Sequence, residues 1–368
     1  MSSQIKSEIV EVNMGPQHPS THGVLRLAIK LDGEITYECK PDVGYLHRGI
    51  EKLAEMRTYI QFIPITDRLD YLASFLGNAA YVYAMEKLGN IEVPQRAEYI
   101  RLVIMELQRI ASHLLFFGTM ALDLGATTPF LYSFREREDV LDIFEATCGA
   151  RLTYNYFRPG GLAKDIPEGF QAQVKAYIKK QREKLPEYND LFTNNQIFLS
   201  RTRNVGVING EDAINYSLSG PTLRGSGVAY DVRKADPYSV YDKIDWKVIT
   251  YPDGDVNSRF MVRLGEISES LNIIEQAIDM IPDGKLEYKM PMRFKLPEGE
   301  VYHHIESARG DLGVYIISDG SEKPYRLRWR APSFINLSAL NVMTKGWKVA
   351  DVVAILGSLD VVLGEVDR

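Results

Sequence analysis

A ten-residue stretch near the start of the chain, residues 14–23, holds two of the six histidines. Pro16 and Pro19 are incompatible with a regular helix here, and glycines bracket the stretch, so we expect a tight loop. Loops held by rigid elements often carry binding chemistry. His18 and His22 are therefore candidate functional residues.

The first chemistry to consider for this pair is metal binding. A His-x-x-x-His pair can bind zinc when it lies on a helix, but Pro19 breaks that geometry and no third ligand is close in the sequence. We take metal binding as the minority interpretation. The alternative for His22 is that its ring satisfies backbone groups of the loop, and spacing alone leaves this open.

Cysteine and glycine usage restricts cofactors further. Cys39 and Cys148 are the only cysteines, and they form no C-x-x-C pair, so the chain cannot by itself supply the thiolates of an iron–sulfur cluster. There is no Walker loop and no G-x-G-x-x-G fingerprint for a dinucleotide. We predict that this chain binds no metal, and that any redox metal belongs to a partner.

Two further residues could take part in chemistry. Tyr71 lies near the start of a predicted helix, where a tyrosine more often serves packing. Asp123 is flanked by leucines, and a buried carboxylate needs a partner and shifts its pKa. Position alone does not decide either case.

The elements that must position these residues follow from hydrophobic periodicity. Alternation predicts strands over 25–31 and 35–39, joined at Asp32-Gly33 as a hairpin with the histidine loop at its entrance. Further strands are expected at 314–317 and 325–330. Residues 205–252 are rich in Gly, Asp, Tyr and Ser and show no clear periodicity, which predicts irregular structure with short strands. Spacing of three and four predicts helices over 46–60 (ended by Pro64), about 70–88, 94–114, 135–156, 167–191, 260–281 and 349–356.

Together these elements predict an α+β fold that is mainly helical, with a central helix bundle, an N-terminal β-hairpin and peripheral strands. We expect one domain over 1–368, divided into a hairpin region (1–45), a helix bundle (46–200) and an α+β remainder (201–368). The formal charge of −6 lacks the basic footprint of a nucleic-acid binder. No apolar run reaches the ~20 residues that span a bilayer, and the start has no signal-peptide pattern. This predicts a cytoplasmic protein.

Several motifs, spread over nearly the whole chain, resemble the quinone-site D subunits of respiratory complex I, the proton-pumping NADH:quinone oxidoreductase. They are Gly15-Pro16-Gln17-His18-Pro19-Ser20-Thr21-His22-Gly23, Gly44-Tyr45-Leu46-His47-Arg48-Gly49, Asp67-Arg68-Leu69-Asp70-Tyr71, Phe134-Arg135-Glu136-Arg137-Glu138, Glu306-Ser307-Ala308-Arg309-Gly310, Arg330-Ala331-Pro332-Ser333-Phe334 and Gly364-Glu365-Val366-Asp367-Arg368. That family is related to the large subunit of nickel–iron hydrogenases. The four nickel-binding cysteines of the hydrogenases fall at Asp70, Ala73, Val362 and Glu365, so the resemblance implies the hydrogenase fold without nickel.

The resemblance implies a quinone headgroup pocket in this chain. His22 and Tyr71 match the residues that hydrogen-bond the two quinone oxygens, and His18 is then structural. Asp123 matches the aspartate that orients the histidine. Arg48 matches an arginine near the terminal 4Fe-4S cluster of a partner subunit. The chain itself would hold no iron–sulfur cluster, flavin or nickel.

The expected protein partners are subunits B, C, I and H of complex I, of which B carries the terminal 4Fe-4S cluster and H lies in the membrane. The expected substrate is quinone, either ubiquinone or menaquinone. The expected location is peripheral, on the cytoplasmic face of the bacterial inner membrane, in an enzyme that takes electrons from NADH. Two alternatives stay open. The same site could be fed by ferredoxin or another donor, or the chain could be a non-catalytic scaffold that docks its neighbours.

One departure from the family pattern lies at Thr153. Many members carry a histidine two residues after the Gly-x-Arg that is here Gly149-Ala150-Arg151. That histidine makes the potential of the nearby cluster depend on pH. The sequence therefore predicts a weaker pH dependence.

Overall fold

The N-terminal region is a three-stranded antiparallel sheet. The computed structural model describes residues 8–17, 23–291 and 293–368, and its first strands are β1 (Ile9–Met14), β2 (Arg26–Asp32) and β3 (Ile35–Asp42), in the order β1-β2-β3. The predicted hairpin of β2 and β3 is confirmed, but β1 was missed. β1 is an edge strand with mostly exposed side chains, so it lacks the alternation that a buried face imposes.

A pair of short helices follows where one helix was expected. α1 (Ile50–Met56) and α2 (Tyr59–Thr66) are separated at Thr58, whose side chain caps α2 through a capping box with Gln61. The prediction of a single helix ended by Pro64 was wrong, because the cap starts a new helix and Pro64 lies inside it.

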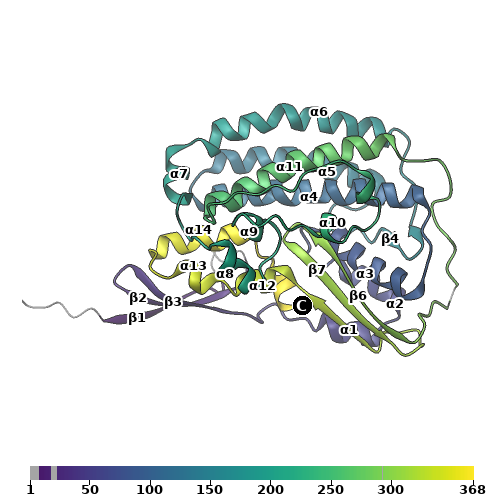
Figure 1. Cartoon of the computed structure of the whole chain (residues 1–368), viewed down its shortest axis with the longest axis horizontal. Coiled ribbons are helices and arrows are strands. Elements are labelled where there is room, and N and C mark those ends of the chain that lie inside the picture. Colours follow the sequence, from purple (N-terminus) through teal and green to yellow (C-terminus); the bar gives the residue numbers. More distant parts are fainter. Residues whose placement is uncertain (1–7, 18–22, 292) are drawn as a thin grey trace, which may run out of the picture.

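Long helices form the largest part of the molecule (Figure 1). They are α3 (Ser74–Gly89), α4 (Gln95–Asp123), α5 (Thr127–Cys148), α6 (Phe170–Tyr188) and α11 (Val256–Asp279). α4 packs against α5 and α11, and α6 lies beside α5 and α11 at the outer side of this bundle (Figure 1). α5 begins earlier than the predicted residue 135, because Pro129 in its first turn is compatible with a helix start.

The second half combines another sheet with short helices. β6 (Gly299–Ser307), β7 (Gly310–Ser318) and β8 (Arg326–Arg330) form an antiparallel sheet that packs against α3, and the sequence had predicted boundaries only for β7 and β8. A two-stranded ribbon of β4 (Phe157–Arg158) and β5 (Gly161–Leu162) precedes α6 in the chain. Further short helices outside residues 205–252 are η2 (Asn189–Thr193), α7 (Gln196–Thr202), α12 (Pro332–Leu337), α13 (Leu340–Thr344), α14 (Val349–Leu359) and α15 (Leu363–Asp367).

All of residues 205–252 are described, and they contain short helices and no strand. The prediction of short strands in this segment was therefore wrong. These helices are α8 (Gly210–Asn215), α9 (Gly220–Arg224), α10 (Val232–Ala235) and η3 (Tyr241–Lys243). Each is too brief for a hydrophobic period to appear in the sequence.

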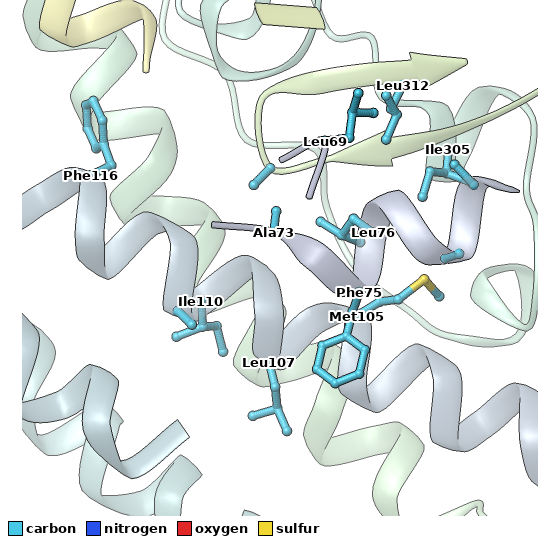
Figure 2. Packing of buried hydrophobic residues seen from close by; sticks show 14 of the residues in the cluster. Leu69, Ala73, Phe75, Leu76, Met105, Leu107, Ile110, Phe116, Ile305 and Leu312 are labelled. Atoms are coloured by element: carbon cyan, nitrogen blue, oxygen red, sulfur yellow. The ribbon is translucent and has the colours of Figure 1, made fainter. Parts of the chain in front are cut away.

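The segment before α3 is fixed by the core. Figure 2 shows Leu69, Ala73 and Leu76 between side chains of α4 and those of β6 and β7, such as Ile305 and Leu312. All five are inaccessible to solvent. Because interiors are close-packed, this turn between α2 and α3 has little freedom to move.

Candidate functional site

Tyr71 lies in the turn between α2 and α3, with fully buried Leu69 and Ala73 on either side of it. The side chain of Asp70 closes the turn, because its Oδ1 accepts a hydrogen bond from the backbone nitrogen of Leu72 at 3.1 Å. Tyr71 itself is half-buried. Burial, and then the charge of Asp70, raise the pKa of its phenol, so it keeps its proton at neutral pH and can donate it.

Arg48 reaches the same place from the segment before α1. Its Nη2 donates to the carbonyl oxygens of Arg68 at 2.8 Å and Gly364 at 3.2 Å. A Cβ atom built on Gly364 would lie 3.0 Å from Arg48 Nη2 and 3.1 Å from Tyr71 Cε1. The absence of a side chain at Gly364 therefore lets Arg48 and Tyr71 approach the same backbone.

The C-terminal helix holds Arg48 in position. Both oxygens of the Asp367 carboxylate accept from backbone nitrogens, of Gly44 at 2.8 Å and of Leu46 at 2.7 Å. The ring of His47 donates from Nδ1 to the backbone oxygen of Asp367 at 2.7 Å. Two motifs from opposite ends of the sequence thus form one unit beside Tyr71.

The end of the histidine loop reaches this unit. His18 and His22 lie outside the described residues. Gly23, the next residue after them, is close enough to α15 that an added Cβ would lie 3.1 Å from Leu363 Cδ1. Leu363 directly precedes Gly364, so Gly23 lies near the part of α15 that also approaches Tyr71.

Asp123 is the last residue of α4 and is half-buried. The same helix carries Ser112, whose hydroxyl accepts from Arg309 Nη1 at 2.7 Å. From Ser112 to Asp123 the helix advances roughly 16 Å. Asp123 is therefore far along α4 from the point where this helix contacts Arg309, the partner of Asp70 in the turn that holds Tyr71.

Two of the four positions that match hydrogenase cysteines, Asp70 and Glu365, lie in one charged cluster of carboxylates and arginine. Arg309 Nη1 pairs with Asp70 at 3.0 Å, and its Nη2 pairs with Asp360 at 3.4 Å. Glu365 lies in the same cluster, and burial together with the charge of Asp70 raises its pKa to about 8. Sequence reasoning recognised the motif that holds Arg309 but assigned this arginine no role.

Within residues 8–17, 23–291 and 293–368, no three His, Cys, Asp or Glu side chains gather in a way that could hold a metal ion. Cys39 is buried and Cys148 is half-buried, and neither forms a disulfide. Within the same residues, every helix is too short or too polar to cross a bilayer.

Thr153 lies close to the turn that holds Tyr71. Two residues after it, the backbone nitrogen of Asn155 donates to Asp67 Oδ2 at 2.6 Å. Asp67 is fully buried, and burial raises its pKa to about 7. The sequence departure at Thr153 is thus adjacent to a motif of the candidate site.

Comparison with known proteins shows the family of the chain. Residues 123–293 and 286–368 match the family model described as respiratory-chain NADH dehydrogenase, 49 Kd subunit. Three similar relatives are each named as the D subunit of NADH-quinone oxidoreductase. They come from Desulforamulus reducens (54% identity, 99% of each chain covered), Dehalococcoides mccartyi (53%, 99% of this chain and 100% of the relative) and Clostridium beijerinckii (51%, 99% of each). The chain belongs to the 49 kDa subunit family of the respiratory-chain NADH dehydrogenases.

Proposed function

We propose that this chain is the D subunit of an NADH:quinone oxidoreductase and forms the quinone headgroup site of that complex. Electrons from a 4Fe-4S cluster in a partner iron–sulfur subunit reduce quinone to quinol at Tyr71 and His22. The observation that carries the proposal is the meeting of Tyr71, Arg48 and the end of the histidine loop at α15.

The chemistry of the site suits quinone reduction. Reduction adds two electrons to quinone, so its oxygens become basic and need proton donors. Tyr71 keeps its proton at neutral pH because burial raises the pKa of its phenol, and it can donate to one oxygen. His22 is proposed as the donor to the other oxygen, with Asp123 orienting its ring.

Arg48 has an electrostatic role in this proposal. Its guanidinium is fixed by two carbonyl oxygens and is partly withdrawn from water. A fixed positive charge stabilises negative charge that develops nearby, which favours the reduced form of an adjacent cluster. Arg48 would therefore promote electron arrival, while Tyr71 and His22 supply protons.

The assembly follows from the same proposal. The relatives are named as subunits of NADH-quinone oxidoreductase, so we place this chain in such a complex, with subunits B, C, I and H as neighbours. It would lie at the cytoplasmic face of the membrane as a peripheral subunit. Copurification of an NADH-binding flavoprotein with the complex would support NADH as donor, whereas its absence together with ferredoxin-driven activity would favour the other donor.

Replacement of Tyr71 by phenylalanine tests the site. In the membrane-bound complex, Tyr71→Phe should lower NADH-driven reduction of a short-chain quinone by roughly 10²-fold, because proton donation at the reacting oxygen contributes on that scale. Ferricyanide reduction by NADH, which reports electron entry, should stay at the parent level, as should the amount of assembled complex.

Tyr81→Phe is the matched control. Tyr81 is a fully buried tyrosine on α3 whose hydroxyl donates to the backbone oxygen of Tyr59 at 3.2 Å. Its loss removes one hydrogen bond of about 1 kcal/mol and no proposed donor. Parent-level quinone reduction in Tyr71→Phe would reject Tyr71 as a headgroup ligand and would favour the scaffold alternative.

A further inference from the structure

A second buried charged cluster lies between α4, α9, α10, α11 and β6, and we call it the Arg224 cluster. Arg224 pairs with Glu266 at 2.7 Å, with Glu306 at 2.8 Å and with Asp231 at 3.3 Å. The pairs continue through Arg233 to Glu106. Its members are Arg109, Arg224, Arg233, Glu106, Asp231, Glu266, Glu306 and His113, and each is at most 3% exposed.

This cluster has more acids than bases. Three arginines, Arg109, Arg224 and Arg233, face four carboxyl groups, Glu106, Asp231, Glu266 and Glu306. An uncompensated charge without contact to water is costly, so a buried acid in excess tends to bind a proton. The cluster therefore needs one proton to be neutral.

The neighbouring charges do not supply the missing positive charge. Arg263 also faces the cluster, at Glu266. It pairs with Asp360, however, and Arg309 pairs with Asp70 and Asp360, so these two arginines belong to a group with Asp70, Asp360 and Glu365 in which the acids again outnumber the arginines. Each half of the buried network thus has one acid in excess.

Contacts distinguish which member holds the proton. Glu106 accepts from Arg233, from Tyr241 and from Ser270, so its charge is satisfied; despite its burial, Arg109 and Arg233 hold its pKa below the usual value.

Glu266 accepts from Arg224 through one oxygen and contacts His113 Nε2 at 2.9 Å through the other. Burial opposes ionisation of Glu266, but Arg224 and His113 hold its pKa well below the usual range. For His113, burial lowers the pKa of the ring against the effect of Glu266, so the ring stays neutral.

Asp231 pairs with Arg233 at 2.7 Å, and despite its burial Arg233 and Arg224 hold its pKa below the usual value, so Glu306 is the remaining candidate. Its carboxyl group accepts from Arg224 Nη1 at 2.8 Å and from the backbone nitrogen of Val232 at 3.1 Å. Burial, and then the charge of Asp231, raise its pKa to about 7 against the effects of Arg224, Arg233 and Arg109. Of the four acids, Glu306 thus binds a proton at the highest pH.

Two short connections join this cluster to Tyr71. Glu306 is followed by Ser307, whose hydroxyl accepts from the backbone nitrogen of Arg309 at 3.2 Å. His113 is preceded on α4 by Ser112, which accepts from Arg309 Nη1. Arg309 pairs with Asp70, the residue before Tyr71. A change of charge at Tyr71 is therefore felt in the Arg224 cluster through low-dielectric protein.

We propose that the Arg224 cluster is a proton-storage site, in which Glu306 takes up one proton when negative charge appears at the quinone site and releases it when that charge is lost. Uptake forms one O–H bond between a solvent proton and the Glu306 carboxylate, and no electron moves. This inference depends on the proposed role of Tyr71 in one respect only, namely that negative charge at the quinone site triggers the proton uptake.

A route for exchange with solvent lies along β6 and β7. Glu306 is opposite Asp311 in the strand register, and Asp311 contacts half-buried His304 at 2.9 Å. Half-buried Tyr230 is next to the cluster, because its backbone oxygen accepts from Arg224 Nη1 at 2.9 Å, and burial and then the charges of Asp311 and Glu306 raise the pKa of its phenol. Glu306 thus shares a strand pair with Asp311 and His304, of which His304 is partly exposed to solvent.

Paired glutamine variants test the protonation state first. Glutamine has the shape of a neutral carboxylic acid, so Glu306→Gln should leave the amount of assembled complex in membranes at the parent level. Glu266→Gln removes an ionised partner of Arg224 and should reduce that amount several-fold. Loss of assembly in Glu306→Gln would overturn the inference, because it would show that the charged form is required.

Infrared spectroscopy of the purified complex then tests proton uptake. In the parent, a carboxylic-acid carbonyl band should titrate near neutral pH, and it should grow on reduction with dithionite in the presence of a short-chain quinone. Glu306→Gln should lower the amplitude of this band by the share of one carboxylic acid and abolish its growth on reduction, while Asp67 and Glu365, whose pKa values burial raises to about 7 and about 8, keep their share. Glu136→Gln is the matched control and should keep the whole band, because Glu136 is a fully buried acid paired with the exposed Arg135, outside the cluster.

The remaining outcomes separate the two proposals. A band that survives unchanged in Glu306→Gln, or is missing from the parent, would overturn the storage site even if Tyr71→Phe has lost quinone reduction. Titration, in the unreacted complex, of the part of the band that Glu306→Gln removes would support the proton on Glu306 even if Tyr71→Phe retains full activity. In that second case the proposed headgroup site fails and the titrating site stands.

Discussion

Gly364 allows a demanding test of the site, because it carries no functional group of its own. It lies in α15, where a Cβ atom would be 2.8 Å from the backbone oxygen of Leu69, 3.0 Å from Arg48 Nη2 and 3.1 Å from Tyr71 Cε1. Ordinary contacts to a Cβ begin at 3.4 Å. Gly364→Ala therefore pushes these groups away by about 0.6, 0.4 and 0.3 Å, the differences between 3.4 Å and the three distances.

The size of the effect follows from these displacements. A misplacement of about 1 Å can cost roughly 10²-fold in rate, so shifts of a third to a half of that distance should lower quinone reduction by about tenfold. Overpacking costs about 1–3 kcal/mol, partly offset by the better helix propensity of alanine, so the complex should still assemble.

The assay is quinone reduction in membranes, normalised to ferricyanide reduction. Gly89→Ala is the matched control, since its Cβ would meet only the ends of Ile91 and Leu296 side chains at 3.0 Å, which can move aside. Parent-level quinone reduction in a fully assembled Gly364→Ala complex would refute the reasoning that Tyr71 and Arg48 are held in a working geometry by this glycine.

Two further predictions concern pH. The reduction potential of the 4Fe-4S cluster proposed for the partner subunit should change little with pH in the parent complex, and Thr153→His should make this change larger. A steep slope of potential against pH in redox titration of the parent would contradict the prediction. Asp67 has a native pKa of about 7 against 3.8 for the ordinary group, so the folded state binds more protons between these values and its stability falls as pH rises from about 4 to about 7. Asp67→Asn should abolish about 3 kcal/mol of the stability difference between pH 5 and pH 8, at about 1.36 kcal/mol for each of the two pH units between 5 and the pKa of about 7. Hydrogen exchange of residues 153–157 at the two pH values measures this difference, and equal pH dependence in parent and variant would show that Asp67 is ionised throughout.

The sequence was most informative where one face of an element is buried. β2 and β3 could be predicted because Leu27 and Ile29 are buried while their neighbours along the strand are more exposed. α11 could be predicted from its apolar spacing. β1 could not, since its side chains are exposed and its place is set by pairing with β2.

Some misses could have been avoided by local signals. The sequence Thr58-x-x-Gln61 is a capping-box pattern and marks the start of α2. The short helices of residues 205–252 show no hydrophobic period in the sequence, and they bury charged side chains such as Arg224 and Arg233. Sequence patterns do not identify buried arginines, which look like surface residues until their partners are known.

The candidate site shows the same limit. Family motifs indicated Tyr71 and Arg48, and the structure brings these two together at Gly364. The role of Arg309 in joining Asp70, Ser112 and Asp360 depends on contacts between residues nearly 240 positions apart in the chain. Such contacts follow from the packing of the turn between β6 and β7 against α4 and the end of α14, and not from any local pattern.

Photoaffinity labelling of the membrane-bound complex tests the central claim most directly. A short-chain quinone with a photoreactive group on its ring, followed by mass spectrometry of the labelled peptides, locates the headgroup. We predict labelling of the peptides that contain Tyr71 and Gly364, and loss of this labelling in the presence of excess unmodified quinone. Labelling confined to another subunit, or unaffected by competing quinone, would contradict a quinone headgroup site in this chain.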